Sequence, residues 1–133
     1  MGSKPLVTVL ASYNSRNRIV RDHEGGIHLF WRMLGIKMTQ SEFLSFAGLV
    51  VDAAEGEVRC GELAMCPCGR AIKCSMGQIM LSYDSLTLWF SPEEFDEFYW
   101  LAATAQQRLA DAASLPQLGV PWRPPSRELE SPN

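Results

Sequence analysis

The sequence predicts an α+β domain that contains an internal duplication of antiparallel β-hairpin plus helix units. Residues 18–50 align with residues 70–102 without a gap. Both segments show the period-two hydrophobic pattern of strands followed by helical spacing, and both carry the same helix-capping signature. Because either unit alone has too little apolar area to bury, we expect the two units to pack about a pseudo-two-fold axis.

The offset between the two segments is 52 residues, and nine of the 33 aligned positions are identical. The identical pairs are Arg18/Arg70, Gly25/Gly77, Ile27/Ile79, Leu29/Leu81, Leu34/Leu86, Glu42/Glu94, Phe43/Phe95, Phe46/Phe98 and Leu49/Leu101. Conservative pairs such as Val20/Ile72 and Trp31/Tyr83 lie between them. The similarity therefore extends over the predicted strands as well as the predicted helix.

In each segment two alternating strands form a hairpin with one apolar face, over residues 27–31 and 34–38 and again over 79–83 and 86–90. A short strand precedes each hairpin, at 18–21 and at 70–73, and residues 6–10 form a first strand rich in β-branched side chains. Each hairpin leads into a helix. These patterns set the predicted boundaries at 18–56 for the first repeat and 70–113 for the second.

The helix starts are predicted from a capping box. Thr39 and Ser91 are the N-caps, and Glu42 and Glu94 follow at the third helical position, where a carboxylate reaches back to the N-cap amide. Gly56 ends the first helix, whereas the second continues to about residue 112.

Length and charge fit a single domain over residues 1–113. A chain of 133 residues that is 47% hydrophobic can bury a stable core without disulfides. The net charge of -3 and the pI near 5.3 give no general attraction for phosphate backbones or anionic lipids. No apolar run approaches the ~20 residues that span a bilayer. We therefore expect a cytoplasmic protein that binds neither nucleic acid nor membrane.

All four cysteines lie between or at the start of the repeats, in and just after a connector predicted over residues 57–69. They are Cys60, Cys66, Cys68 and Cys74. Soft thiolate ligands in a reducing compartment predict one structural zinc ion, with an iron–sulfur cluster as the less favoured metal. A single ion requires the strand at 70–73 to be broken or bulged. If residues 57–74 form a hairpin instead, the thiols fall into two separate pairs.

Basic residues recur on the short strand of each segment. Arg18, Arg21, Arg70 and Lys73 are candidates for an anion-binding patch at the pseudo-two-fold axis, and the alternative is that they are ordinary solvated charges. No nucleophile elbow, catalytic triad spacing or phosphate-binding loop occurs, and neither histidine stands in a catalytic pattern. The sequence therefore favours a protein without enzymatic activity.

Exposed aromatic residues predict a partner-binding surface. Phe30 and Trp89 fall on outward-facing strand positions, and Trp122 lies in a tail over residues 114–133 that holds five of the eight prolines and is predicted to be extended. The tail either presents Trp122 to a partner or straps onto its own domain. The sequence therefore predicts a small accessory or adaptor protein that acts through protein–protein contacts. The alternative is a metal-binding or thiol-redox protein that uses the four cysteines.

Overall fold

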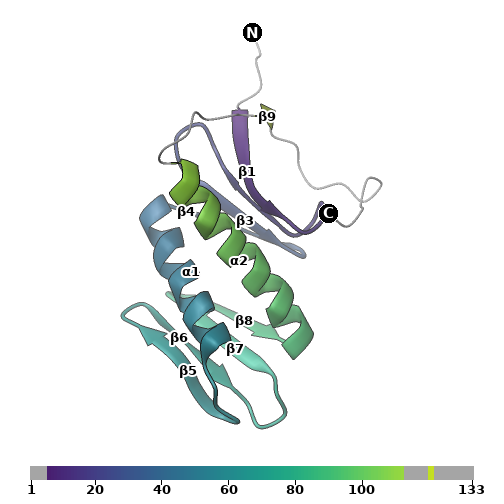
Figure 1. The fold of residues 1–133 in the computed structure, drawn as a ribbon, viewed down its shortest axis with the longest axis vertical. Helices are drawn as coiled ribbons and strands as arrows, with labels where there is room; N and C mark the ends of the chain where they lie inside the picture. Colours follow the sequence, from purple (N-terminus) through teal and green to yellow (C-terminus); the bar gives the residue numbers. More distant parts are fainter. Residues whose placement is uncertain (1–5, 113–119, 122–133) are drawn as a thin grey trace. The chain divides into compact units, whose positions relative to one another are not determined.

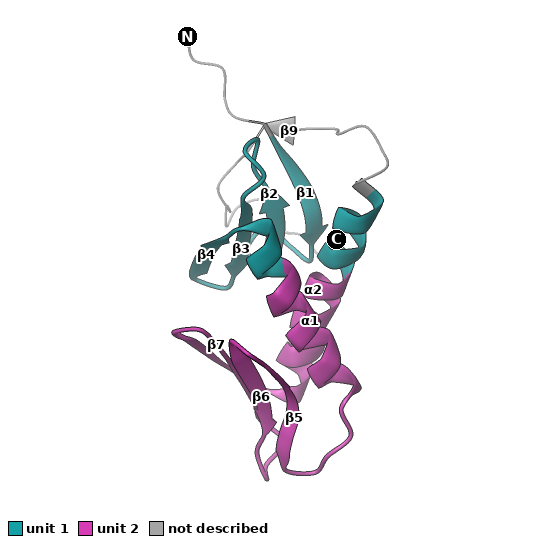
Figure 2. Ribbon diagram, turned by 90° about the vertical axis from the view of Figure 1, so that its left-hand side faces the viewer, with its two compact units in different colours: residues 1–43, 104–133 teal, residues 44–103 magenta. Residues whose placement is uncertain are grey.

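The computed structural model describes residues 6–112 and 120–121, which form two antiparallel β-sheets and two helices (Figure 1). The α+β class is confirmed. The chain divides into two compact units: unit 1 comprises residues 1–43 and 104–133, and unit 2 comprises residues 44–103 (Figure 2). Each unit holds one sheet. Helices α1 (Gln40–Glu55) and α2 (Pro92–Ala112) each have one end in unit 1 and the other in unit 2.

The sheet of unit 1 has five strands in the order β4-β3-β2-β1-β9. Their bounds are Leu6–Ser12 (β1), Arg18–Arg21 (β2), Ile27–Trp31 (β3), Leu34–Met38 (β4) and Val120–Pro121 (β9). On β3, Ile27, Leu29 and Trp31 are buried on one face, as the period-two pattern predicts. Because β9 pairs with β1, two residues of the predicted tail add a strand to this sheet.

The sheet of unit 2 has four strands in the order β5-β6-β7-β8. Their bounds are Gly61–Cys66 (β5), Gly69–Lys73 (β6), Ile79–Tyr83 (β7) and Leu86–Phe90 (β8). The segment predicted as a connector, residues 57–69, therefore contains β5 and the turn into β6. The hairpin alternative for residues 57–74 describes this part of the chain.

The strand registers of the two sheets match. In unit 1, Ile27 pairs with Met38 and Arg18 with Phe30; in unit 2, Ile79 pairs with Phe90 and Arg70 with Ser82, each residue being 52 positions later. The turns match as well, because Gly25 and Gly77 both have a φ of 91°, and Arg32 and Asp84 have φ values of 56° and 55°. The same secondary structure thus recurs at the predicted offset, whereas packing about a pseudo-two-fold axis stays a prediction.

The repeated pattern includes one more strand than the sequence analysis assigned to it. β1 pairs with β2, and β5 pairs with β6, each with a register shift, between Val9 and Ala11 in β1 and between Glu62 and Ala64 in β5. These two bulged strands correspond at an offset of 53, one more than the offset of the later strands. Each unit therefore contains four consecutive antiparallel strands joined by three hairpin connections, and the first of these strands carries a bulge.

The predicted capping boxes are present at both helix starts. Thr39 Oγ1 accepts a hydrogen bond from Glu42 N at 3.1 Å, and Glu42 Oε1 accepts one from Thr39 N at 2.7 Å. At the second helix the Ser91 and Glu94 bonds are 3.1 and 2.8 Å. The second helix begins with Pro92, at the position where a missing amide costs no hydrogen bond. The helix starts are therefore fixed by local sequence.

The core of each unit is apolar and follows the predicted faces. In unit 2, Phe46 lies edge-on to Tyr83 and to Phe98, with ring centroids 5.3 and 5.9 Å apart. Phe90 lies 4.8 Å from Phe98 and 5.5 Å from Phe95. Edge-to-face aromatic packing of this kind adds to the burial energy.

Neither α1 nor α2 has the length and apolar character that a membrane-spanning helix requires.

Candidate functional site

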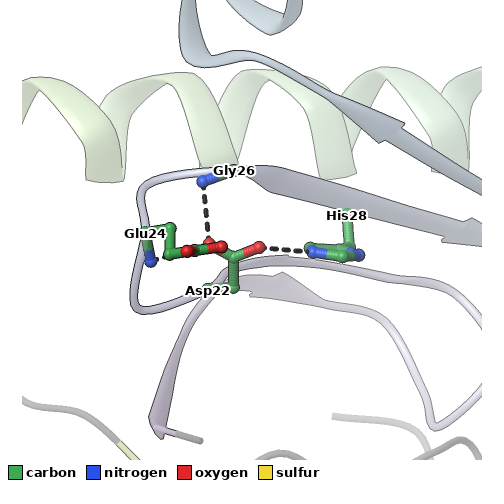
Figure 3. Close-up of polar contacts among 4 residues, drawn as sticks. All are labelled: Asp22, Glu24, Gly26 and His28. Atoms are coloured by element: carbon green, nitrogen blue, oxygen red, sulfur yellow. Dashed lines mark hydrogen bonds and ion pairs between the residues drawn. The ribbon is translucent and has the colours of Figure 1, made fainter.

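A polar cluster lies at the β2–β3 turn of unit 1 (Figure 3). Asp22 follows β2, and its Oδ1 accepts hydrogen bonds from the backbone amides of Glu24 and Gly26, both at 2.9 Å. Its Oδ2 lies 2.8 Å from Nε2 of His28, which comes from β3. The Asp22 side chain thus holds the turn together and orients the imidazole at the same time.

The pKa of the Asp22 carboxyl reflects this environment. Burial on its own raises the pKa, but the hydrogen bonds from His28, Gly26 and Glu24, together with the charge of His28, outweigh burial. The pKa of Asp22 therefore lies below its ordinary value. Both carboxylate oxygens of Asp22 have hydrogen-bond partners.

An open pocket of about 650 Å³ adjoins this cluster in unit 1. It is lined by Asp22, Glu24, Gly25, Gly26, Lys37, Met38, Thr39, Gln40 and Glu42. The lining comes from the β2–β3 turn on one side and from the end of β4 and the start of α1 on the other. Its ionisable side chains are three carboxylates and one lysine.

In unit 2 five of the equivalent positions carry an apolar or thiol side chain, whereas Glu94 keeps the carboxylate of Glu42. At an offset of 52, Cys74 replaces Asp22, Met76 replaces Glu24, Met80 replaces His28, Trp89 replaces Lys37 and Pro92 replaces Gln40. The turn itself is unchanged: Cys74 N donates to Gln78 O at 2.8 Å and Gly77 N donates to Cys74 O at 2.9 Å, as at Asp22 and Gly25. The two units thus share the backbone of this turn but differ in side-chain polarity at these five positions.

These replacements leave apolar side chains at the surface of unit 2. Met76 is 89% exposed and Trp89 is 59% exposed. Met80 is the Cα partner of both Ile72 on β6 and Trp89 on β8, so the three side chains form a cross-strand row on the outer face of the sheet. We call the four residues Ile72, Met76, Met80 and Trp89 the outer patch. Trp89 thereby fits its predicted place on an outward face.

The other two predicted partner-binding residues, Phe30 and Trp122, do not belong to the outer patch. Phe30 lies on the outer face of the unit 1 sheet, where its ring is half-buried against Gly35 and stacks with His28 at 6.4 Å. Trp122 lies outside the described residues, as does the predicted tail except for Val120 and Pro121. Since these two residues pair with β1, the strapping alternative holds for this short stretch.

The four cysteines are free and lie at the two ends of one hairpin. Cys66 ends β5 and Cys68 is in the turn before β6, whereas Cys60 and Cys74 flank the opposite end. A single ion requires the strand at 70–73 to be broken or bulged. This strand is β6, which is continuous and pairs with β7 without a register shift, and an extended strand of this length puts Cys68 and Cys74 about 20 Å apart. Among the described residues no group of three or more His, Cys, Asp or Glu side chains is placed to hold a metal ion.

The basic residues of each short strand point to opposite sides of their sheet. On β2, Arg18 and Arg21 are three positions apart and therefore alternate between faces, and the same holds for Arg70 and Lys73 on β6. Arg18 Nε is buried without a hydrogen-bond partner in the described part of the chain, and burial lowers the pKa of this guanidinium. Neither unit on its own gathers its two basic residues into one patch, and the four-residue site stays a prediction.

The sequence analysis does not predict the polar cluster, because it treats His28 as a lone histidine and assigns no role to Asp22. A signal was present, however, since the aligned segments differ in chemistry at the positions around this turn while the turn glycine is retained. No protein-family model, curated protein or solved structure matches this chain. The function must therefore be argued from these surfaces alone.

The Asp22 carboxylate gives a pH-dependent prediction. A group whose folded pKa is depressed stabilises the fold above its unfolded pKa of ~3.9, and this stabilisation is lost as the pH falls through the folded value. We therefore expect Asp22→Asn to lower the free energy of unfolding at pH 7 by about 1–2 kcal/mol, and to have a smaller effect at about pH 2–3.

Urea denaturation of both proteins between pH 2 and pH 7 measures this difference. Cys74→Asp serves as the reciprocal variant, because it places a carboxylate at the same position of the unit 2 turn. We expect it to add a stabilisation that is present at pH 7 and disappears in acid. An Asp22→Asn effect of equal size at all pH values would contradict the assignment.

Proposed function

We propose that this protein is a small adaptor without enzymatic activity that binds a protein partner through the outer patch of unit 2. The observation that carries the proposal is the row Ile72, Met80 and Trp89, which places an indole that is 59% exposed beside two further apolar side chains. Single exposed apolar residues are normal on protein surfaces, but adjacent ones mark interaction sites.

The residue types favour a protein partner. Tryptophan and methionine are enriched in the centres of protein–protein interfaces, and methionine adapts its shape to different surfaces. The lone Trp89 on an edge strand gives the patch one large anchor for a pocket of the partner. Met76, in the adjoining turn and 89% exposed, widens the contact.

The comparison between the units supports this reading. Unit 1 places Glu24, His28 and Lys37 at the positions of Met76, Met80 and Trp89. Since the same backbone accepts charged side chains there, the fold does not need apolar ones. The apolar side chains in unit 2 are therefore better explained by burial against a partner than by the stability of the chain.

The test exchanges Trp89 for the residue that unit 1 carries at that register. We expect Trp89→Lys to weaken binding about 30-fold, because a buried interfacial tryptophan commonly contributes about 2 kcal/mol. Thr87→Lys is the matched control, since Thr87 is exposed on the same strand and the same face.

The partner is identified by placing a photo-crosslinking amino acid at position 76 in cells of the source organism, because Met76 is 89% exposed in the outer patch and its replacement leaves the Trp89 anchor in place. A discrete cross-linked protein that binds the wild-type chain and the Thr87→Lys variant, but not the folded Trp89→Lys variant, supports the proposal. A partner that binds Trp89→Lys undiminished, or a folded chain that cross-links to nothing at this position, contradicts it. Circular dichroism checks that both lysine variants are folded.

A further inference from the structure

The open end of the β5–β6 hairpin carries two of the four thiols, one on each strand side. Gly61 and Lys73 form the last antiparallel pair at this end; Cys60 precedes Gly61 and Cys74 follows Lys73, so that each cysteine lies one residue beyond this pair. Directly opposed residues of antiparallel strands have Cα atoms about 4.5–5.5 Å apart. Disulfide-linked cysteines have Cα atoms about 4.4–6.8 Å apart, so a pair at this position needs little backbone movement to bridge.

The chemical state of these residues suits a reversible bond. Both cysteines are free thiols, Cys60 is exposed and Cys74 is half-buried. Gly61, with a φ of 122°, marks the bend at which the chain leaving α1 turns into β5. A bond at this bend would tie the start of β5 to the end of β6.

The remaining thiols are too far away to compete. Cys66 and Cys68 lie at the other end of the hairpin, separated from Cys60 and Cys74 by the length of the strands, about 20 Å. They stand on either side of Pro67, whose ring fixes φ in the turn. Unit 1 has no such pair, because Asp22 occupies the position of Cys74.

We propose that Cys60 and Cys74 form a redox-sensitive clasp that a hydroperoxide closes. One thiolate attacks the peroxide and becomes a sulfenic acid as the first oxygen leaves as water. The second thiolate then attacks the sulfenic sulfur and a second water leaves, so that two thiols and one hydrogen peroxide give one disulfide and two waters. The thiols supply two electrons to the peroxide, and a dithiol reductant reverses the reaction.

The closed clasp has a measurable effect on stability. The bond closes a loop of 15 residues, counted from 60 to 74 inclusive (74 − 60 + 1). Restricting such a loop in the unfolded chain raises the melting temperature of a domain of this size by on the order of 10 °C.

The experiment uses the full chain, reduced and then treated with hydrogen peroxide. Peptide mass mapping without reduction should show residues 60 and 74 linked with the loss of two hydrogens. The melting temperature should rise by on the order of 10 °C and return on addition of dithiothreitol. The double variant Cys66→Ser/Cys68→Ser should keep the full shift, and Cys60→Ser should lose it.

Three results would overturn the clasp. The first is a Cys66–Cys68 bond formed in place of Cys60–Cys74. The second is a melting shift that survives in Cys60→Ser. The third is near-stoichiometric zinc in the reduced, untagged protein that protects all four thiols from alkylation, because one shared ion would require all the sulfurs to meet at one point. None of these results bears on the outer patch, which is tested through Trp89.

Discussion

Replacing Phe98 with alanine will lower the free energy of unfolding by about 3–5 kcal/mol. The Phe98 side chain on α2 is 1% exposed and contacts the rings of Phe46 and Phe90, at centroid distances of 5.9 and 4.8 Å. Removing the ring takes away its own burial and leaves a cavity between two aromatic side chains that are fixed by other contacts. The effect is large because a close-packed core relaxes only partly into such a cavity.

Urea denaturation followed by far-ultraviolet circular dichroism measures this loss. Trp100→Ala is the matched control, since Trp100 lies on the same helix but is 44% exposed, and we expect a loss of about 1 kcal/mol or less. A loss for Phe98→Ala no greater than that for Trp100→Ala would show that the aromatic cluster does not hold unit 2 together.

The elements that could be predicted from the sequence are those with local causes. The capping boxes at Thr39 and Ser91 and the alternation along residues 27–31 and 79–83 require only neighbouring residues, and the structure contains each of them. Because the two segments align at an offset of 52 residues, each strand or helix start predicted in the first unit was also predicted in the second. The helix ends at Glu55 and Ala112 also follow the predicted positions.

The correspondence between the first strands of the two units, β1 and β5, could not be found in this way. β1 and β5 correspond at an offset of 53 because the chain between β5 and β6 is one residue shorter than that between β1 and β2. An ungapped alignment at 52 places their residues on opposite faces, since a shift of one residue inverts the pleat. Both strands also contain a β-bulge. A bulge is a feature of backbone geometry, and no residue type in the sequence is specific to it.

The candidate site was predictable only in part. Trp89 is exposed as its register predicts, whereas the pocket beside Asp22 depends on how a turn brings Asp22, Lys37 and Thr39 together from separate elements. The cysteines show the same limit. Their clustering in sequence was plain, but a hairpin sends neighbours in the chain to opposite ends of a strand, so that proximity in sequence did not mean proximity in space.

Gly69 is the position at which a single methyl group should do the most damage to unit 2. Gly69 begins β6 and pairs with Cys66 on β5 and with Tyr83 on β7. A Cβ built on it collides with the carbonyl oxygen of Ser82 and lies 3.0 Å from Tyr83 Cα. Because both atoms belong to the backbone of β7, no side-chain rotation relieves the collision, and the strands must separate.

Unit 1 shows that the fold itself does not require glycine at this position. The position 52 residues earlier is Asn17, whose Oδ1 accepts a hydrogen bond from Arg32 N at 2.7 Å. In unit 2 the equivalent amide, Asp84 N, donates to the carbonyl of Cys68 instead, also at 2.7 Å. In unit 2 a backbone carbonyl therefore takes the place of the Asn17 side chain as acceptor, and the backbone of β7 leaves no room for a side chain at Gly69.

We expect Gly69→Ala to lower the free energy of unfolding by about 2–3 kcal/mol, since overpacking against rigid neighbours costs about this much. Gly48→Ala is the matched control, because Gly48 lies within α1 with no atom within 4 Å of a built Cβ. Alanine there should raise the stability by about 0.5–1 kcal/mol, as a better helix former than glycine. Urea midpoints of the two variants should thus move in opposite directions from the wild type. A Gly69→Ala protein as stable as the wild type would mean that β6 and β7 do not approach as closely as their backbone contact at Ser82 requires.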